Sequence, residues 1–263
     1  MSMTRHTQLP RPNNADLTFI GRSIRHSLRD GEGLLMAILL PVFMMGLFVF
    51  VFGGAMNVAG RDGYVSYIVP GIIIMCAGFG ASSTATLVAG DMKTGIIDRF
   101  RTMPIRGSAV LTGHVVASVL RNLVATAVVV LVGLLTGFRP SADVVGWLGA
   151  LAIIATYILT ITMLFAAIGL VAGSPEAANA YGFVLLFLPY LSSAFVPVET
   201  MPTWLQWVAE NQPITPVIES IRALLGSGDV GWNVLIAILW CVGILVIAVI
   251  WSSLMFRRKS GRR

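Results

Sequence analysis

Charged residues, cysteines and histidines are all scarce in this sequence. Charged residues make up 11% of its 263 residues, whereas soluble domains carry about 25%. Hydrophobic residues make up 56%, and several apolar stretches reach the length of about 18 residues that a helix needs to cross a bilayer. The sequence therefore predicts an all-α polytopic membrane protein, one domain with little mass outside the lipid.

The motifs of several enzyme classes are missing. Cys76 and Cys241 lie inside apolar stretches without ligand spacing and are interpreted as small buried hydrophobic residues. The three histidines form no HExxH or HxxxH, and there is no GxSxG, which argues against a metal enzyme or an intramembrane hydrolase. No GxxxxGK[ST] occurs either, so the chain cannot bind ATP by a P-loop. No cofactor is expected in this chain, and if ATP energises its activity, another polypeptide must hydrolyse it.

The basic residues indicate the orientation in the membrane. Six spans are predicted, over residues 34–52, 64–89, 109–137, 144–172, 176–198 and 232–256. Of the 18 Lys and Arg, five precede the first span, five lie from Lys93 to Arg121 and five follow the last span. The positive-inside rule then places both termini in the cytoplasm. The protein is expected in the cell (plasma) membrane. Because the net charge of +6 is explained by these flanks, no nucleic acid is expected as a partner.

The segment before the first span divides into two parts. Residues 1–13 are polar and contain prolines, which predicts a disordered tail. Over residues 16–29, apolar side chains recur on one helical face, with arginines elsewhere. This pattern predicts an amphipathic helix, which either lies along the lipid headgroups or docks on protein. The members of the apolar face are Leu17, Ile20, Ile24 and Leu28.

A second amphipathic helix is predicted in the loop between spans 2 and 3. Met92, Ile96, Phe100 and Met103 share one face, and Pro104 ends the helix. It is either an ordinary interfacial helix or a docking element for a soluble partner.

Three polar residues near or within the spans have alternative interpretations. Arg121 either extends to the cytoplasmic surface or faces the bundle interior beside His114. His114 itself is either a structural residue or a proton relay. Glu199 either faces external water or pairs with a polar group to hold an outer gate.

The stretch from Ser174 to Gly228 departs from a simple hairpin between two spans. Ser174-Pro175-Glu176 is a typical helix start, with a capping hydroxyl, a proline and an acid in the first turn. The apolar run that follows is broken by several prolines and continues in short apolar pieces. We therefore expect a helix that enters the bilayer, breaks and dips back, which is tolerated only where protein or a water-filled cavity covers the backbone.

These features together resemble one family, the ABC-2-type transporter permeases, and within it the daunorubicin/doxorubicin-exporter-like permeases of actinobacteria. The resemblance covers nearly the whole chain from Gly21 on. It is carried by residues 98–106, 120–122, 174–178, 192–206 and 211–216. The chain departs from the family pattern at Asn211-Gln212-Pro213, where an Asn-Pro pair is expected.

The resemblance implies a half-transporter within residues 14–263. Two permeases, either two copies or a copy and a paralogue, pair in the membrane lipid and bind two ATP-binding-cassette ATPase subunits, which use ATP and Mg²⁺. It also implies three groups of functional residues. The connecting helix contains Ile20, Ile24 and Leu28; the ATPase-docking coupling helix contains Ile96, Ile97, Arg99, Phe100, Arg101 and Met103; the re-entrant outer gate contains Phe195, Pro197, Glu199 and Trp204.

The sequence thus predicts the permease subunit of an exporter for a hydrophobic or amphipathic substrate, such as a drug, lipid or glycolipid. The alternative is an ATP-independent membrane protein, either an ion-coupled carrier or a scaffold subunit. Ion-coupled carriers usually place acidic or histidine relays within their spans, and here only Arg121 and His114 come close.

Overall fold

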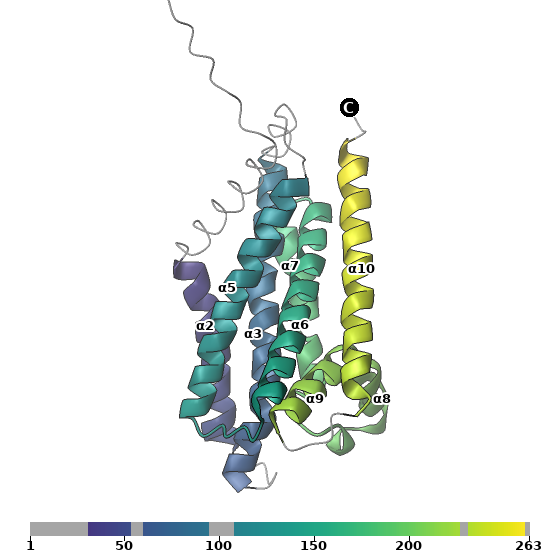
Figure 1. The fold of residues 1–263 in the computed structure, drawn as a ribbon. Helices are drawn as coiled ribbons and strands as arrows, with labels where there is room; N and C mark the ends of the chain where they lie inside the picture. Colours follow the sequence, from purple (N-terminus) through teal and green to yellow (C-terminus); the bar gives the residue numbers. More distant parts are fainter. Residues whose placement is uncertain (1–30, 54–59, 95–107, 227–230, 261–263) are drawn as a thin grey trace, which may run out of the picture.

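The computed structural model describes residues 31–53, 60–94, 108–226 and 231–260, which form helices and turns without any strand (Figure 1). The all-α prediction is confirmed for this part of the chain. The tail over residues 1–13 and the predicted connecting helix over 16–29 lie outside it. The elements are α2 (Gly31–Gly46), the π-helix η1 (Leu47–Phe52), α3 (Gly60–Lys93), α5 (Ser108–Leu135), α6 (Val144–Val171), α7 (Pro175–Leu186), the 3-10 helices η2 (Leu188–Leu191) and η3 (Val198–Thr200), α8 (Thr203–Asn211), α9 (Ile214–Leu225) and α10 (Asn233–Ser260).

Helix α3 is the central helix of the bundle. It packs against α2, α5, α6, α7 and α9, and every residue from Ile68 to Ala77 is buried. A helix surrounded on all sides has to be apolar all round, and this segment is. Gly71 adds a close approach, because a Cβ there would lie 2.6 Å from the carbonyl oxygen of Ala194.

Four helices of the described part are long and apolar enough to cross a membrane, namely α3, α5, α6 and α10. The chain is a multi-pass membrane protein. The segment Ala37–Phe52 is a shorter apolar helix. Helix α7 has 12 residues, about 18 Å at 1.5 Å per residue, and so is shorter than the hydrocarbon core of about 30 Å. The count of six spans stays a prediction.

The chain predicted as a single span over residues 176–198 is divided in the structure. Helix α7 begins as the sequence predicts, with the Ser174 hydroxyl accepting a hydrogen bond from the amide of Ala177 at 3.2 Å. It ends at Leu186, and η2 follows with Pro189 inside it. Proline lacks the N–H that a continuing α-helix would need, so the chain turns here and reaches η3 through residues 192–197.

The short helices α8 and α9 lie at one end of the bundle, beside the start of α10 (Figure 1). Ile214 at the start of α9 lines a cavity together with Tyr157 from the middle of α6. Leu224 near its end contacts Gly149 in the first turns of α6. Helix α9 therefore runs from the level of the middle of α6 to the level of the first turns of α6. The end of α10 lies at the opposite end (Figure 1).

Candidate functional site

The four residues predicted for the outer gate lie in different environments. Phe195 is buried, with its ring stacked between Phe48 of η1 at 4.6 Å and Tyr190 of η2 at 5.2 Å. Pro197 precedes η3 and is half-buried. The side chains of Glu199 in η3 and Trp204 in α8 are exposed. The structure thus places Phe195 in the core, Pro197 at an intermediate depth and Glu199 and Trp204 on the surface of the α8 end. Exposure of Glu199 fits the alternative in which it faces water.

Exposed tryptophans mark the same end of the bundle. Trp204 and Trp207 on α8 and Trp232 before α10 are each at least 70% exposed. Tryptophan is enriched at membrane–water interfaces, where its ring is amphipathic. Trp204 was predicted as a gate residue, whereas Trp207 and Trp232 were not singled out from the sequence.

Arg222 connects three segments at this end of the bundle. Its guanidinium donates hydrogen bonds to the carbonyl oxygens of Tyr67 at 2.9 Å and Ser193 at 3.1 Å, and forms an ion pair with Glu219. It also lies 3.8 Å from the centroid of the Tyr67 ring, and the Tyr67 hydroxyl donates to Ser193 at 2.9 Å. Arginine therefore joins α9, α3 and the turn after η2. The i, i+3 spacing of Glu219 and Arg222 was visible in the sequence, but the two carbonyl partners were not.

Gln212, which stands between Asn211 and Pro213 where the resemblance leads us to expect an Asn-Pro pair, also has a structural role. Its side-chain amide donates to the carbonyl of Leu191, which joins the α8–α9 turn to the end of η2. A buried amide needs such a partner, and this one fixes where the chain turns back.

A row of aromatic rings runs from α7 to η1. Phe183 packs edge-on to Phe187 at 5.0 Å, Phe187 lies 6.0 Å from Tyr190, and Tyr190 and Phe195 continue the row to Phe48. Phe183 and Phe187 are more than half exposed. The π-helical form of η1 is unusual, and π-helical turns are frequent at functional sites.

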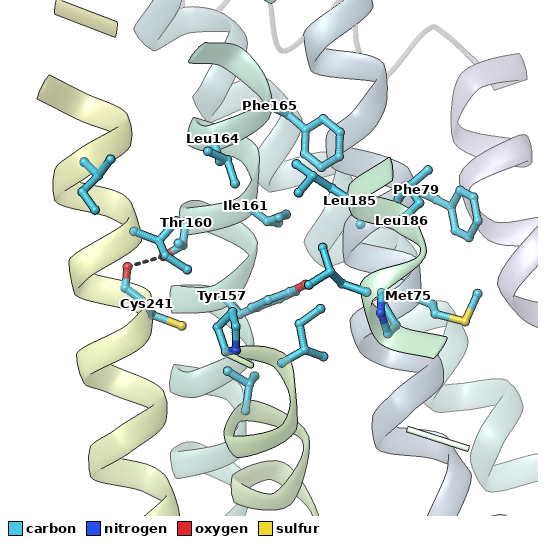
Figure 2. A pocket seen from close by; sticks show the side chains of 18 residues that line it. Met75, Phe79, Tyr157, Thr160, Ile161, Leu164, Phe165, Leu185, Leu186 and Cys241 are labelled. Carbon is cyan, nitrogen blue, oxygen red and sulfur yellow. Dashed lines mark hydrogen bonds between the residues drawn. The ribbon is translucent and has the colours of Figure 1, made fainter. Parts of the chain in front are cut away.

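An apolar cavity of about 300 Å³ lies inside the bundle. Figure 2 shows Cys241 of α10 and Leu185 and Leu186 of α7 on opposite sides of it, with Tyr157 between them. The Thr160 hydroxyl lies at its edge and donates to the carbonyl of Cys241 at 3.2 Å. Both cysteines are free and buried, in agreement with their interpretation from sequence.

Buried polar side chains of α5 form hydrogen bonds with α3. Arg121 is 3% exposed and donates to the carbonyl of Gly80 at 3.3 Å and to the Ser83 hydroxyl. Asn122 donates to the carbonyl of Ala77 at 3.3 Å. Of the two alternatives for Arg121, the structure therefore shows the one in which it faces the interior.

His114, also on α5, has a partner nearer the end of the bundle. Its Nε2 lies 2.7 Å from a carboxylate oxygen of Asp91 on α3. This pair supports a structural role for His114. Within the described residues, no group of three His, Cys, Asp or Glu side chains can hold a metal ion.

The other predicted site residues lie outside the described part of the chain. They are the coupling-helix residues Ile96, Ile97, Arg99, Phe100, Arg101 and Met103 and the connecting-helix residues Ile20, Ile24 and Leu28.

The family of this chain follows from comparison with known proteins. A family model described as ABC-2 type transporter matches residues 17–225, most of the chain. The chain belongs to the ABC-2 type transporter family. Three relatives are similar to it at 23–29% identity. They are the daunorubicin resistance ABC transporter permease protein DrrB1 of Streptomyces coeruleorubidus (29% identical, covering 94% of this chain and 87% of the relative), the probable doxorubicin resistance ABC transporter permease protein DrrC of Mycobacterium tuberculosis (23%, 97% and 95%) and the probable multidrug ABC transporter permease YbhR of Escherichia coli (26%, 74% and 53%).

This ABC-2 type protein is therefore a transmembrane permease subunit of an ATP-binding-cassette exporter. The relatives are permease subunits and not ATPases, in agreement with the missing P-loop. An ion-coupled carrier or a scaffold subunit is not favoured.

Proposed function

We propose that two permeases, either two copies of this chain or one copy and a paralogue, form an export pathway for hydrophobic or amphipathic compounds. Two ATPase subunits, which bind ATP and Mg²⁺, drive it from the cytoplasmic side of the plasma membrane, where both termini of this chain lie. The substrate class is a drug, lipid or glycolipid. The names of the relatives, which concern daunorubicin and doxorubicin resistance, support it.

The exposed aromatic row carries the proposal. Phe183, Phe187 and Tyr190 are exposed on the outside of a single subunit, where a second subunit can approach. Aromatic rings bind flat or amphipathic molecules through large contact areas and stacking. A twofold pair of subunits would bring two such rows together around one path.

The α8–α9 pair serves as the outer gate in this proposal. With α2–η1 and α7 counted as spans, the bundle has six, and α8 and α9 form the re-entrant segment between the fifth and sixth. The bonds of Arg222 to the carbonyl of Ser193 and of Gln212 to the carbonyl of Leu191 support this role, because they satisfy backbone carbonyls at and just after the end of η2 that water would otherwise have to solvate.

A transport assay tests the pathway. The permease is co-expressed with its ATPase, and ATP-dependent uptake of daunorubicin is measured in inside-out vesicles. We expect Phe187→Ala to lower kcat/KM about three- to tenfold, since an aromatic contact contributes about 0.5–1.5 kcal/mol beyond its buried area. Trp240→Ala, which removes an exposed aromatic ring from α10, should leave transport unchanged. Equal loss in both variants, or no ATP-dependent uptake by the wild type, would contradict the proposal.

The coupling helix over residues 91–104 is proposed to dock on the ATPase through Ile97 and Phe100. Replacing either with Asp places a charge in an apolar contact, so we expect the ATPase to be lost from the purified complex while membrane insertion stays normal. Thr102→Asp, off the apolar face, is the matched control. Retention of the ATPase by Phe100→Asp and Ile97→Asp would exclude this docking role.

A further inference from the structure

The cavity between α7 and α10 lies at mid-depth in the bundle. Its walls include Met75 to Phe79 from α3, Tyr157 to Phe165 from α6, and Cys241 to Ile247 from α10. Each of these segments lies near the middle of a helix of 28 residues or more. In a helix centred in the bilayer, such positions are level with the hydrocarbon chains rather than with the headgroups.

The walls of the cavity are unsuitable for water. They are lined almost wholly by aliphatic and aromatic side chains, and the hydroxyls that reach them are those of Tyr157 and Thr160. The Thr160 hydroxyl already donates to the carbonyls of Thr156 at 2.8 Å and Cys241 at 3.2 Å. A buried water requires two to four polar partners, so these groups do not hold the roughly ten waters that about 300 Å³ would admit.

The cavity also reaches the surface that faces lipid. Ile247 is both part of its wall and 64% exposed. The main packing partners of α10 are α6 and α9, and that of α7 is α3. The space between α7 and α10 is therefore open to the surrounding hydrocarbon along the side of Ile247.

We propose that the acyl chain of a membrane phospholipid occupies this cavity. At about 30 Å³ for each group of methylene size, the volume accommodates the last ten or so carbons of one chain. A chain anchored by its headgroup at the interface reaches this depth, because half of the hydrocarbon core is about 15 Å. The lipid is a fixed component of the subunit, distinct from the exported compound.

The bound acyl chain would fill the space between α7 and α10 and so add packing contacts to α10. Pro189 of η2 and Val217 of α9 line the same cavity as residues of α10. The acyl chain therefore contacts both α9, which is part of the proposed outer gate, and α10, which follows it. This assignment stands independently of the aromatic row, which lies on the exposed face of α7.

Two variants on α10 test the occupant. Ile244→Phe adds a ring to the cavity wall, whereas Ile250→Phe makes the same change at a position that is 52% exposed and outside the wall. The ATPase–permease complex is reconstituted in vesicles of phosphatidylethanolamine and phosphatidylglycerol. The probe is a phosphatidylethanolamine with a diazirine near the end of one acyl chain, and labelled residues are located by mass spectrometry.

We expect strong labelling of Val217, which is 1% exposed and therefore inaccessible to bulk lipid. Ile244→Phe should reduce it roughly fourfold or more, since each methylene that loses its place weakens binding by roughly fourfold. Labelling of Leu239, 63% exposed to the lipid, should stay constant in both variants. Ile250→Phe should leave Val217 labelling as in the wild type.

Three outcomes would overturn the proposal. The first is absence of labelling at Val217 in the wild type, and the second is labelling that Ile244→Phe does not reduce. The third is displacement of the label by excess daunorubicin, which would assign the cavity to the exported compound. None of these readouts depends on transport, so failure of this inference is distinguishable from failure of the proposed function.

Discussion

Helices α3 and α10 are both long enough to span a membrane, yet they relate to the rest of the bundle in opposite ways. In the most apolar window of α3, 72% is buried, compared with 17% for α10. Helix α10 is nevertheless the more apolar of the two. Apolarity in a membrane protein therefore does not indicate burial in protein, because lipid is as good a solvent for Leu and Ile as the protein core is.

The two helices differ in the kind of residue that they place at contacts. Helix α3 uses small residues, such as Gly71 and Gly80, where other backbones or polar side chains come close. Gly243 of α10 has open space around its Cβ position. Small residues allow close packing on α3, whereas many large residues of α10 are exposed. This contrast predicts how substitutions act on each helix.

The largest expected effect comes from truncating a core side chain on α3. Ile72→Ala removes a side chain that is 0% exposed, and such truncations lower the free energy of unfolding by about 2–5 kcal/mol. Ile250→Ala, the same change on α10, should cost less than about 0.5 kcal/mol. Unfolding of the purified permease in mixed micelles measures both. Equal losses would show that α10 is packed as tightly as α3.

A smaller effect with opposite signs is expected for two glycines. Gly71→Ala would place its Cβ 2.6 Å from the Ala194 carbonyl oxygen and 2.8 Å from the Ala194 Cβ, so the turn after η2 must shift, at a cost of about 1–3 kcal/mol. Gly243→Ala meets nothing within 4 Å and should stabilise α10 by up to about 1 kcal/mol through helix propensity. Melting temperatures of the two variants should move in opposite directions, and a shared direction would contradict the contrast.

The smallest expected effect concerns the bond that joins α10 to α6. Thr160→Val removes the hydrogen bond to the carbonyl of Cys241, and interhelical bonds in membranes contribute about 0.6 kcal/mol on average. Amide hydrogen exchange in α10 should accelerate by roughly threefold. Thr156→Val, whose hydroxyl bonds only within α6 to Ala152, should leave exchange in α10 unchanged. An equal acceleration of exchange in both variants would show that the effect arises within α6 and not from the hydrogen bond between α6 and α10.

Much of the helical layout was predictable from sequence because its signals are local. The Ser174 cap, the acid in the first turn of α7 and the apolar runs depend on residues near one another in the chain. The division of the stretch over 176–198 at Pro189 was also signalled locally, although a single span was predicted through it. Other features of the site depend on hydrogen-bond partners that are distant in sequence. The interior placement of Arg121 requires the carbonyl of Gly80, and the role of Arg222 requires Tyr67 and Ser193.

The sequence by itself determined the membrane class, the apolar helices, the family and the absence of a P-loop motif, because composition, periodicity and motifs are properties of the chain alone. Only the tertiary structure decided that α3 is central, that α10 stands at the margin, that Arg222 joins three segments and that a cavity opens between α7 and α10. The physical reason is that protein interior and lipid are equally apolar. Which of them a side chain faces is settled by packing between helices far apart in sequence.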